Sequence, residues 1–271
     1  MKNFEMGSAS RKFLSTNSTQ VAAWLRTWFA AAGKNIRDAE LELAAAILPN
    51  LFGYHIVQLG NHVSGDFFAT TRISHALLVA NETGRELLLD IVGRCDALPL
   101  AANSIDVLVV PHILEFAVEP HAVLREAERV LIGEGHIVIA GFNPWSLCGF
   151  WRLLAGWRGK PPWSGQFLSV SRIKDWLKLL GFEVEFLKKT SFRPPLRRDT
   201  ISRKLGFVEQ LGSYCWPFFG NVYIVVARKH VAAVTPLKSS WQTRRRVIAG
   251  GVAEPTTRAR ERSPIRRNRG R

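Results

Sequence analysis

The hydrophobic pattern at the start of the chain predicts two helices. Apolar residues recur at helical spacing over Thr19–Ala32 and again over Ile36–Leu48. The first segment also carries Arg26 and two tryptophans, which suits an amphipathic helix on the surface. Pro49 is expected to end the second helix, because proline cannot continue one.

Short apolar runs further along the chain predict buried strands. The runs are rich in β-branched residues and leucine, and Gly, Asn, Asp or Pro bounds them. They cover Tyr54–Leu59, Ala76–Ala80, Glu86–Ile91, Ile105–Val110, His136–Ala140, Phe182–Lys188 and Val222–Ala227.

A helix between two of these strands indicates the fold class. It is expected to begin at Pro120, where a missing N–H is tolerated, and to end before Gly133 and Gly135. Strand, helix and strand at this spacing predict a parallel crossover, and such crossovers build an α/β sheet covered by helices on both faces. A later helix is predicted over Ser171–Leu180, with Ser171 as its N-cap.

The positive charge of the chain is concentrated at its end. The net charge is +15, and the residues from Lys238 onward carry one Lys and ten Arg against two Glu, so they supply +9 of it. This segment, rich in Arg, Thr, Gly and Pro, cannot bury enough apolar surface to fold. It is interpreted either as a solvated tail with weak attraction for anions or as a nucleic-acid contact.

Cysteine usage and hydropathy indicate the compartment. Cys95, Cys148 and Cys215 are far apart in sequence, so neither a disulfide framework nor a zinc site is expected. No apolar run reaches the roughly 20 residues that span a bilayer, and the first residues do not resemble a secretory signal. A cytoplasmic protein without a transmembrane segment is predicted.

Four consecutive segments carry recognisable motifs. They are C-D-A-L-P-L at Cys95–Leu100, N-S-I-D-V-L-V-V-P-H-I-L-E-F at Asn103–Phe116, E-P-H-A-V-L-R-E-A-E-R-V-L at Glu119–Leu131 and G-E-G-H-I-V-I-A-G at Gly133–Gly141. This succession resembles the class I S-adenosylmethionine-dependent methyltransferases, particularly the branch of ubiquinone-pathway and other small-molecule enzymes. More narrowly, G-F-N-P-W-S-L at Gly141–Leu147 is similar to an uncharacterised bacterial subgroup of the family.

The resemblance implies a Rossmann-like, doubly wound sheet of seven strands, mostly parallel with the last strand antiparallel. The methyltransferase-like domain is expected over residues 19–233, with the N-terminal helices in front of the sheet and a Trp-rich insert at 143–168. Residues 1–18 and the basic tail 234–271 are expected to be disordered.

The same resemblance places S-adenosylmethionine at the carboxyl ends of the strands. Asp96 matches the carboxylate that accepts a hydrogen bond from the adenine amino group, although an Asp here also suits a plain turn cap. Gly60 is either a cofactor contact or a turn glycine. The expected cofactor-binding residues are Leu59, Gly60, Asp96, Ala97, Leu98, Val110 and Pro111.

The loop after the first strand departs from the family pattern. The family reads close to G-x-G-x-G, whereas this chain has Q-L-G-N-H-V-S-G-D at Gln58–Asp66, with Gly60 in register. Glycines in this loop let the backbone approach the cofactor closely. The family has an acidic residue after the second strand. In this chain Ala80, Asn81 and Glu82 are the candidates for that position. Both changes bear on cofactor binding rather than on the fold.

His112 is the candidate catalytic residue. Its ordinary pKa of about 6.5 suits a general base for a hydroxyl or amine acceptor. Since the methyl group leaves an activated sulfonium, holding the acceptor in line can suffice, and a structural His bonded to a loop carbonyl is the alternative. Glu115 is expected to anchor the same loop, and no metal site is expected.

The segment Asn143–Phe167 holds four tryptophans interleaved with basic residues. It is interpreted as a lid over the substrate, as a surface for bases or a membrane, or as packing against the sheet.

Two hypotheses of function remain. The first is methyl transfer to a small, partly apolar acceptor, which the Asp96 turn favours. The second is a methyltransferase fold without catalysis that serves as a binding module for a partner such as RNA, which the altered loop favours. An oxidoreductase is disfavoured, because no G-x-G-x-x-G follows a predicted strand.

Overall fold

The computed structural model describes residues 18–63, 67–81, 90–155, 161–192 and 220–230. The segments predicted to be a disordered N-terminus and a disordered basic tail therefore lie outside the described residues, apart from Ser18, where the first helix begins. The helices are α2 (Ser18–Ala30), α3 (Lys34–Ile47), α4 (Pro120–Val130), α5 (Leu147–Ala155) and α6 (Val170–Leu179), with the 3-10 turn η1 (Leu48–Asn50) after α3. The strands are β1 (His55–Leu59), β2 (His75–Ala80), β3 (Ile91–Val92), β4 (Ile105–Pro111), β5 (Leu131–Phe142), β6 (Phe182–Thr190) and β7 (Val222–Lys229).

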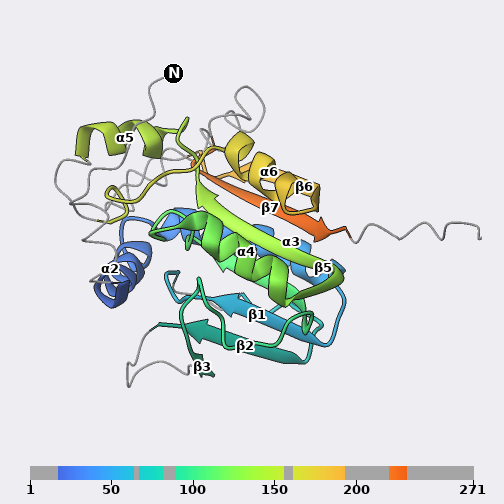
Figure 1. Ribbon diagram of the computed structural model, residues 1–271. Helices are drawn as coiled ribbons and strands as arrows, with labels where there is room; N and C mark the ends of the chain where they lie inside the picture. The colour runs from blue at the N-terminus through green and yellow to red at the C-terminus, as the bar shows by residue number, and fades with distance from the viewer. Residues whose placement is uncertain (1–17, 64–66, 82–89, 156–160, 193–219, 231–271) are drawn as a thin grey trace, which may run out of the picture. The chain divides into compact units, whose positions relative to one another are not determined.

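The strands form one seven-stranded sheet in the order β3-β2-β1-β4-β5-β7-β6 (Figure 1). Neighbours from β3 to β5 pair in parallel, whereas β7 runs antiparallel to both β5 and β6. The expected Rossmann-like sheet with a reversed last strand is thus confirmed. All parallel strands end at the same edge of the sheet, which is where ligands bind in doubly wound folds.

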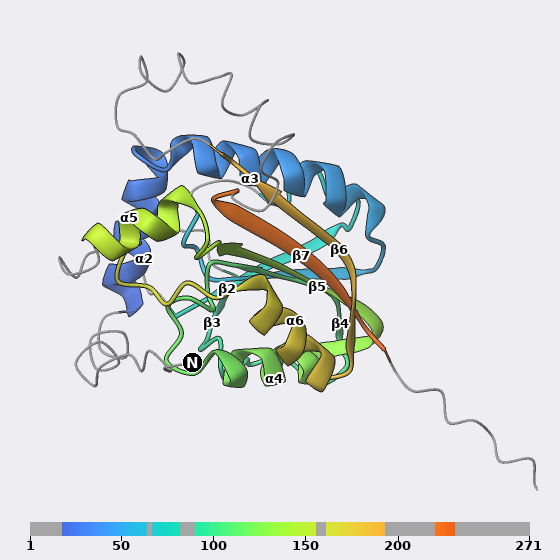
Figure 2. The same cartoon turned by 90° about the horizontal axis from the view of Figure 1, so that it is seen from above.

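Helices cover both faces of the sheet, as the crossover pattern predicts (Figure 2). Alternate residues of β4 point to opposite faces. Val107 and Val109 join a core cluster with residues of α2 and α3, whereas Leu108 and Val110 join a second cluster with residues of α4 and α6. None of the described helices is long and apolar enough to cross a membrane.

Two local predictions are wrong. The helix ends before Gly133 and Gly135 as expected, at Val130, but the next strand, β5, begins at Leu131 instead of His136 and contains both glycines. The pairing between β4 and β5 shifts at this point, and a Cβ on Gly135 would crowd the Asp106 carbonyl oxygen at 3.1 Å. The glycines therefore serve a close approach within the sheet.

The N-cap of α6 is Ser169 rather than Ser171. The Ser169 hydroxyl accepts a hydrogen bond from the Arg172 N–H at 3.3 Å, while Ser171 already lies inside the helix. The strand predicted over Glu86–Ile91 falls mostly outside the described residues, and the described part of this region forms the two-residue β3.

Lys229, the last residue of β7, joins the sheet to the end of α4. Its Nζ donates hydrogen bonds to the carbonyl oxygens of Glu128 at 2.7 Å and Leu131 at 2.9 Å, and to Asn103 Oδ1 at 3.3 Å. It also forms an ion pair with Glu128 Oε1 at 3.0 Å. A cation here satisfies carbonyl groups that the last helical turn leaves unpaired.

Replacing Lys229 by Met is expected to lower the free energy of unfolding by about 2–3 kcal/mol, because nearly buried carbonyl groups lose a charged donor. Urea denaturation measures the change. The exposed Lys178→Met in α6 serves as the control and is expected to stay within about 0.5 kcal/mol of the parent chain. Equal losses in both variants would contradict this role of Lys229.

Candidate functional site

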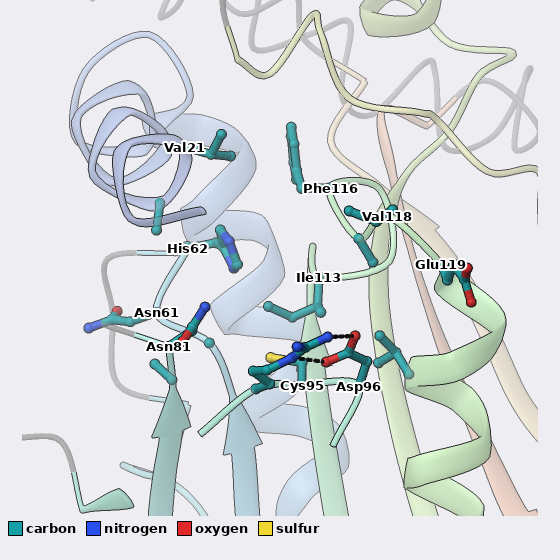
Figure 3. Close-up of a pocket in the computed structure, with 16 residues that line it drawn as sticks. Val21, Asn61, His62, Asn81, Cys95, Asp96, Ile113, Phe116, Val118 and Glu119 are labelled. Carbon is teal, nitrogen blue, oxygen red and sulfur yellow. Dashed lines mark hydrogen bonds and ion pairs between the residues drawn. The ribbon is translucent and has the colours of Figure 1, made fainter. Parts of the chain in front are cut away.

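A cavity of about 600 Å³ lies at the carboxyl edge of the parallel strands (Figure 3). This volume falls in the range of about 300–1,000 Å³ that small-molecule sites occupy. Segments that follow four different strands meet here, and α2 contributes one wall. The lining residues are Val21, Ala22, Gly60, Asn61, His62, Ala80, Asn81, Arg94, Cys95, Asp96, Ile113, Phe116, Ala117, Val118, Glu119 and Val123.

Gly60 ends β1 in a conformation that suits glycine. Its φ is +69°, and its N–H donates to the Val79 carbonyl oxygen at 2.7 Å. A Cβ at this position would collide with Ile113 Cδ1 and approach His62 Nδ1. The turn and the packing of two pocket residues therefore both depend on a missing side chain at Gly60.

Asp96 stands at the base of the pocket, paired with Arg94. Arg94 Nε and Nη2 donate to the two carboxylate oxygens at 2.9 and 2.7 Å. These hydrogen bonds hold the pKa of Asp96 below its ordinary value, so the group is ionised at neutral pH. Since a carboxylate offers about four lone-pair positions, Asp96 can still accept a hydrogen bond from a ligand.

Cys95 lines the pocket beside Asp96 but is chemically quiet. Burial of the thiol, together with the negative charge of Asp96, raises the pKa of Cys95 to about 12. A thiol that stays protonated is a poor nucleophile.

His112 lies behind the pocket wall, fully buried. Its Nε2 is 2.6 Å from Glu40 Oε1 on α3, and its Nδ1 is 3.3 Å from Glu115 Oε1. Burial alone lowers the pKa of an imidazole, but the attraction and hydrogen bonds of the two carboxylates outweigh it and raise the pKa of His112 to about 10. His112 is therefore a buried cation at neutral pH, and such a group is not available as a base.

Glu115 connects this buried group to the sheet. Its Oε1 accepts the N–H of Phe142, the last residue of β5, at 2.5 Å. Its main-chain oxygen accepts the N–H of Gln166 at 2.8 Å. The expectation that Glu115 anchors the loop is consistent with these contacts. The loop after β4, which supplies Ile113 and Phe116 to the pocket, is thus fixed from behind.

His62 is a neutral histidine on the pocket wall. Burial, followed by the positive charges of His112 and Arg26, lowers the pKa of His62 to about 3. Its ring stacks on Phe116 at 6.1 Å between centroids, and its Nδ1 is buried without a hydrogen-bond partner among the described residues.

The structure brings together two of the predicted site residues, Gly60 and Asp96. Ala97 lies in the turn beside Asp96, and the N–H of Leu98 donates to Glu126 Oε2 at 3.1 Å. The other predicted residues, Leu59, Val110, Pro111 and His112, are buried at the ends of β1 and β4 and are not among the lining residues.

Sequence reasoning missed the contributions of α2, Arg94 and the loop residues Ile113–Glu119. A signal existed for Arg94, which stands two residues before Asp96. Of the three candidates named after the second predicted strand, Ala80 and Asn81 line the pocket. Val21 and Ala22 line the pocket although they lie far from its other lining residues in the sequence, and no local sequence pattern predicts this position. In the described part of the chain, no group of three or more His, Cys, Asp or Glu could hold a metal ion.

Part of the Trp-rich insert packs against the domain, as one of its interpretations holds. Trp163 meets Trp28 of α2 at 6.0 Å, and Phe167 stacks on Phe142 at 5.0 Å between ring centroids. Trp145 and Trp151 are exposed instead. Trp157 lies outside the described residues.

A sheet of this order, with β7 reversed and a nucleoside-sized cavity at its carboxyl edge, defines the class I methyltransferase fold. Comparison with known proteins gives the same class. A family profile described as "Methyltransferase domain" matches residues 53–139. The uncharacterised protein YafS of Escherichia coli K12 is 31% identical over 192 residues, which is 70% of this chain and 75% of YafS. The chain belongs to this methyltransferase family, whose members use S-adenosylmethionine as methyl donor.

More distant relatives extend the comparison. The uncharacterised protein MJ1123 of Methanocaldococcus jannaschii is 29% identical over 119 residues, 44% of this chain and 58% of that protein. A S-adenosylmethionine-dependent methyltransferase of Thermotoga maritima has a similar fold, with a TM-score of 0.55, 18% identity and coverage of 83% of this chain and 100% of its own. A chain of the complex between the activator Trm112 and a methyltransferase of Haloferax volcanii has a TM-score of 0.52 at 16% identity. The match covers 77% of this chain and 99% of that chain.

Replacing Glu40 by Gln is expected to make stability less dependent on pH. A raised pKa means that the buried cation contributes stability fully below the unfolded-state value of about 6.5 and loses it as the pH rises through about 10. The free energy of unfolding of the parent chain should therefore exceed that of Glu40→Gln by about 3 kcal/mol at pH 6. This difference should narrow between pH 6.5 and 10. Urea unfolding at several pH values measures it.

The exposed Glu42→Gln on the same helix is the matched control, with an expected change within about 0.5 kcal/mol at each pH. A gap for Glu40→Gln that stays constant or widens toward pH 10 would show that His112 is not held as a cation.

Proposed function

We propose that the pocket binds S-adenosylmethionine and that the chain transfers its methyl group to a small, partly apolar acceptor. One observation carries the proposal: a single cavity of about 600 Å³ at the carboxyl edge of the sheet is shared by Gly60, Asn81 and Asp96. In the family these positions face the nucleoside part of the donor.

The residues present fit an adenosine moiety. Asp96 offers an ionised acceptor for the adenine amino group, while Ile113 and Val123 offer apolar walls for the base. Asn81, one of the three candidates for the position where the family has an acidic residue, lines the pocket, and its amide can hydrogen-bond to a ribose hydroxyl. Arg94 holds Asp96 in place from the side.

The acceptor is assigned to the α2 side of the cavity. Val21, Phe116 and Val118 are apolar there, and His62 is neutral, so an uncharged or aromatic molecule fits better than a phosphate. S-adenosylmethionine supplies a methyl group on an already activated sulfonium. The chain then has to align the acceptor and exclude water, and His112 contributes by holding the wall rather than by contact with the acceptor.

Asp96→Ala is expected to weaken the binding of S-adenosylhomocysteine at least tenfold, because a charged hydrogen-bond acceptor is worth about 1.5–3 kcal/mol. Isothermal titration of the full chain measures the affinity. Asp175→Ala, an exposed acidic residue on α6, is the control and should bind like the parent chain.

An absence of heat for the parent chain with millimolar S-adenosylmethionine or S-adenosylhomocysteine would contradict the enzyme hypothesis. A parallel titration with a single-stranded RNA then tests the binding-module hypothesis. The same RNA, titrated at low and high salt, tests the expected contact of residues 234–271 with nucleic acid, since such contacts weaken steeply with salt.

Asn81→Asp is expected to tighten S-adenosylhomocysteine binding several-fold, because a carboxylate accepts a hydroxyl hydrogen bond roughly twice as strongly as an amide oxygen. Asn81→Leu, similar in size but without polar atoms, is expected to weaken it. Unchanged affinity in both variants would place the ribose away from Asn81.

A further inference from the structure

Helix α5 presents its large apolar side chains to solvent. Leu147, Phe150 and Trp151 are spaced as i, i+3 and i+4, so they lie on one face of the helix. Phe150 is 60% exposed and Trp151 52%, and Trp145 in the turn just before the helix is 74% exposed. Monomeric domains seldom expose such side chains together without an interaction to serve.

The opposite face of α5 is firmly seated on the domain. Cys148 and Gly149 are buried, and the backbone of Pro144 lies so close to Gly149 that a Cβ there would collide with it. The Cys148 N–H donates to Asn221 Oδ1 at 3.2 Å. The helix therefore cannot rotate to bury Phe150 and Trp151 without losing these contacts, and the exposure belongs to the fold.

The sequence on either side of this helix carries charge of one sign. No Asp or Glu occurs between Glu134 and Asp175, whereas this stretch contains basic residues: Arg152, Arg158, Lys160, Arg172 and Lys174. The segment between Glu5 and Asp38, which includes α2, likewise has no acidic residue and carries Arg11, Lys12, Arg26, Lys34 and Arg37. Both views place α2 and α5 at the same end of the sheet (Figures 1 and 2).

We propose that α5 and the turn before it, residues Trp145–Trp151, dock on the surface of a membrane that contains anionic lipid. Exposed Trp, Phe and Leu on a helix with basic surroundings are the side chains that insert at the boundary between headgroups and acyl chains. The basic residues and the lack of acidic ones complement an anionic headgroup layer, which attracts each nearby Lys or Arg.

A nucleic acid fits the same face less well. Single-stranded nucleic acid needs aromatic rings for stacking together with cations that follow the phosphates. On the exposed face of α5, Leu147 offers no ring, and the one described cation of the helix, Arg152, is half-buried over the Phe167 ring at 5.3 Å. The exposed face of α5 is therefore too apolar, and offers too few cations, to bind a row of phosphate groups.

Vesicle flotation tests the proposal with the full chain. The vesicles are either pure phosphatidylcholine or a mixture with phosphatidylglycerol, and the double variant Phe150→Ser/Trp151→Ser is compared with the parent chain. The parent chain should float with the mixed vesicles, and the double variant should bind at least about tenfold more weakly, because two large apolar side chains no longer insert. Binding should fall in high salt and be weaker to pure phosphatidylcholine.

The matched control is Phe52→Ser/Tyr54→Ser, which removes two exposed aromatic residues just before β1, at the opposite end of that strand. It should bind vesicles like the parent chain, and circular dichroism checks that both double variants fold. If the parent chain fails to float, or if both double variants float equally well, the proposal is wrong, and any binding then comes from elsewhere, such as the basic tail. Loss of binding to a single-stranded RNA in the α5 variant, with vesicle binding unchanged, would overturn it in favour of a nucleic-acid surface.

Discussion

The buried contact of His112 with Glu40 and Glu115 is the interaction on which the candidate site depends. It joins α3, the loop after β4 and the end of β5, three segments that lie apart in the sequence. A charged group taken out of water is costly unless it is paired, so the three side chains hold one another in a single arrangement. The wall formed by Ile113 and Phe116 has a defined position because of this arrangement.

The altered loop after β1 does not close the pocket: Asn61 and His62 line its wall, and Val63 packs into the core instead. Val63 is fully buried in the core cluster with α2 and α3. The His62 ring stacks on Phe116, and the Asn61 carbonyl oxygen accepts a hydrogen bond from Arg26 Nη1 at 3.3 Å. Gly60 has no side chain to fill the cavity at the end of β1, and Val21 and Ala22 of α2 line part of the cavity wall.

The sequence predicted the sheet better than the site, for a physical reason. Strands such as Ile105–Val110 and the helix from Pro120 follow from local periodicity, and the reversed β7 followed from family resemblance. Gly60 could be placed because it directly follows a strand at the ligand-binding edge, and Asp96 because its motif resembles that of the family. The charge of His112 could not be predicted, since it depends on Glu40, 72 positions away, and the approach of α2 depends on tertiary packing.

The way in which α5 packs on the domain explains why its side chains Leu147, Phe150 and Trp151 are exposed. The chain leaves β5 beside the pocket, and α5 packs there through small residues such as Cys148 and Gly149, which allow close approach but bury little apolar area. Leu147, Phe150 and Trp151 keep 49–60% of their surface exposed, so they gain less from the core of their own domain than fully buried side chains would. Their shared face is therefore the part of α5 that contact with a further partner would bury.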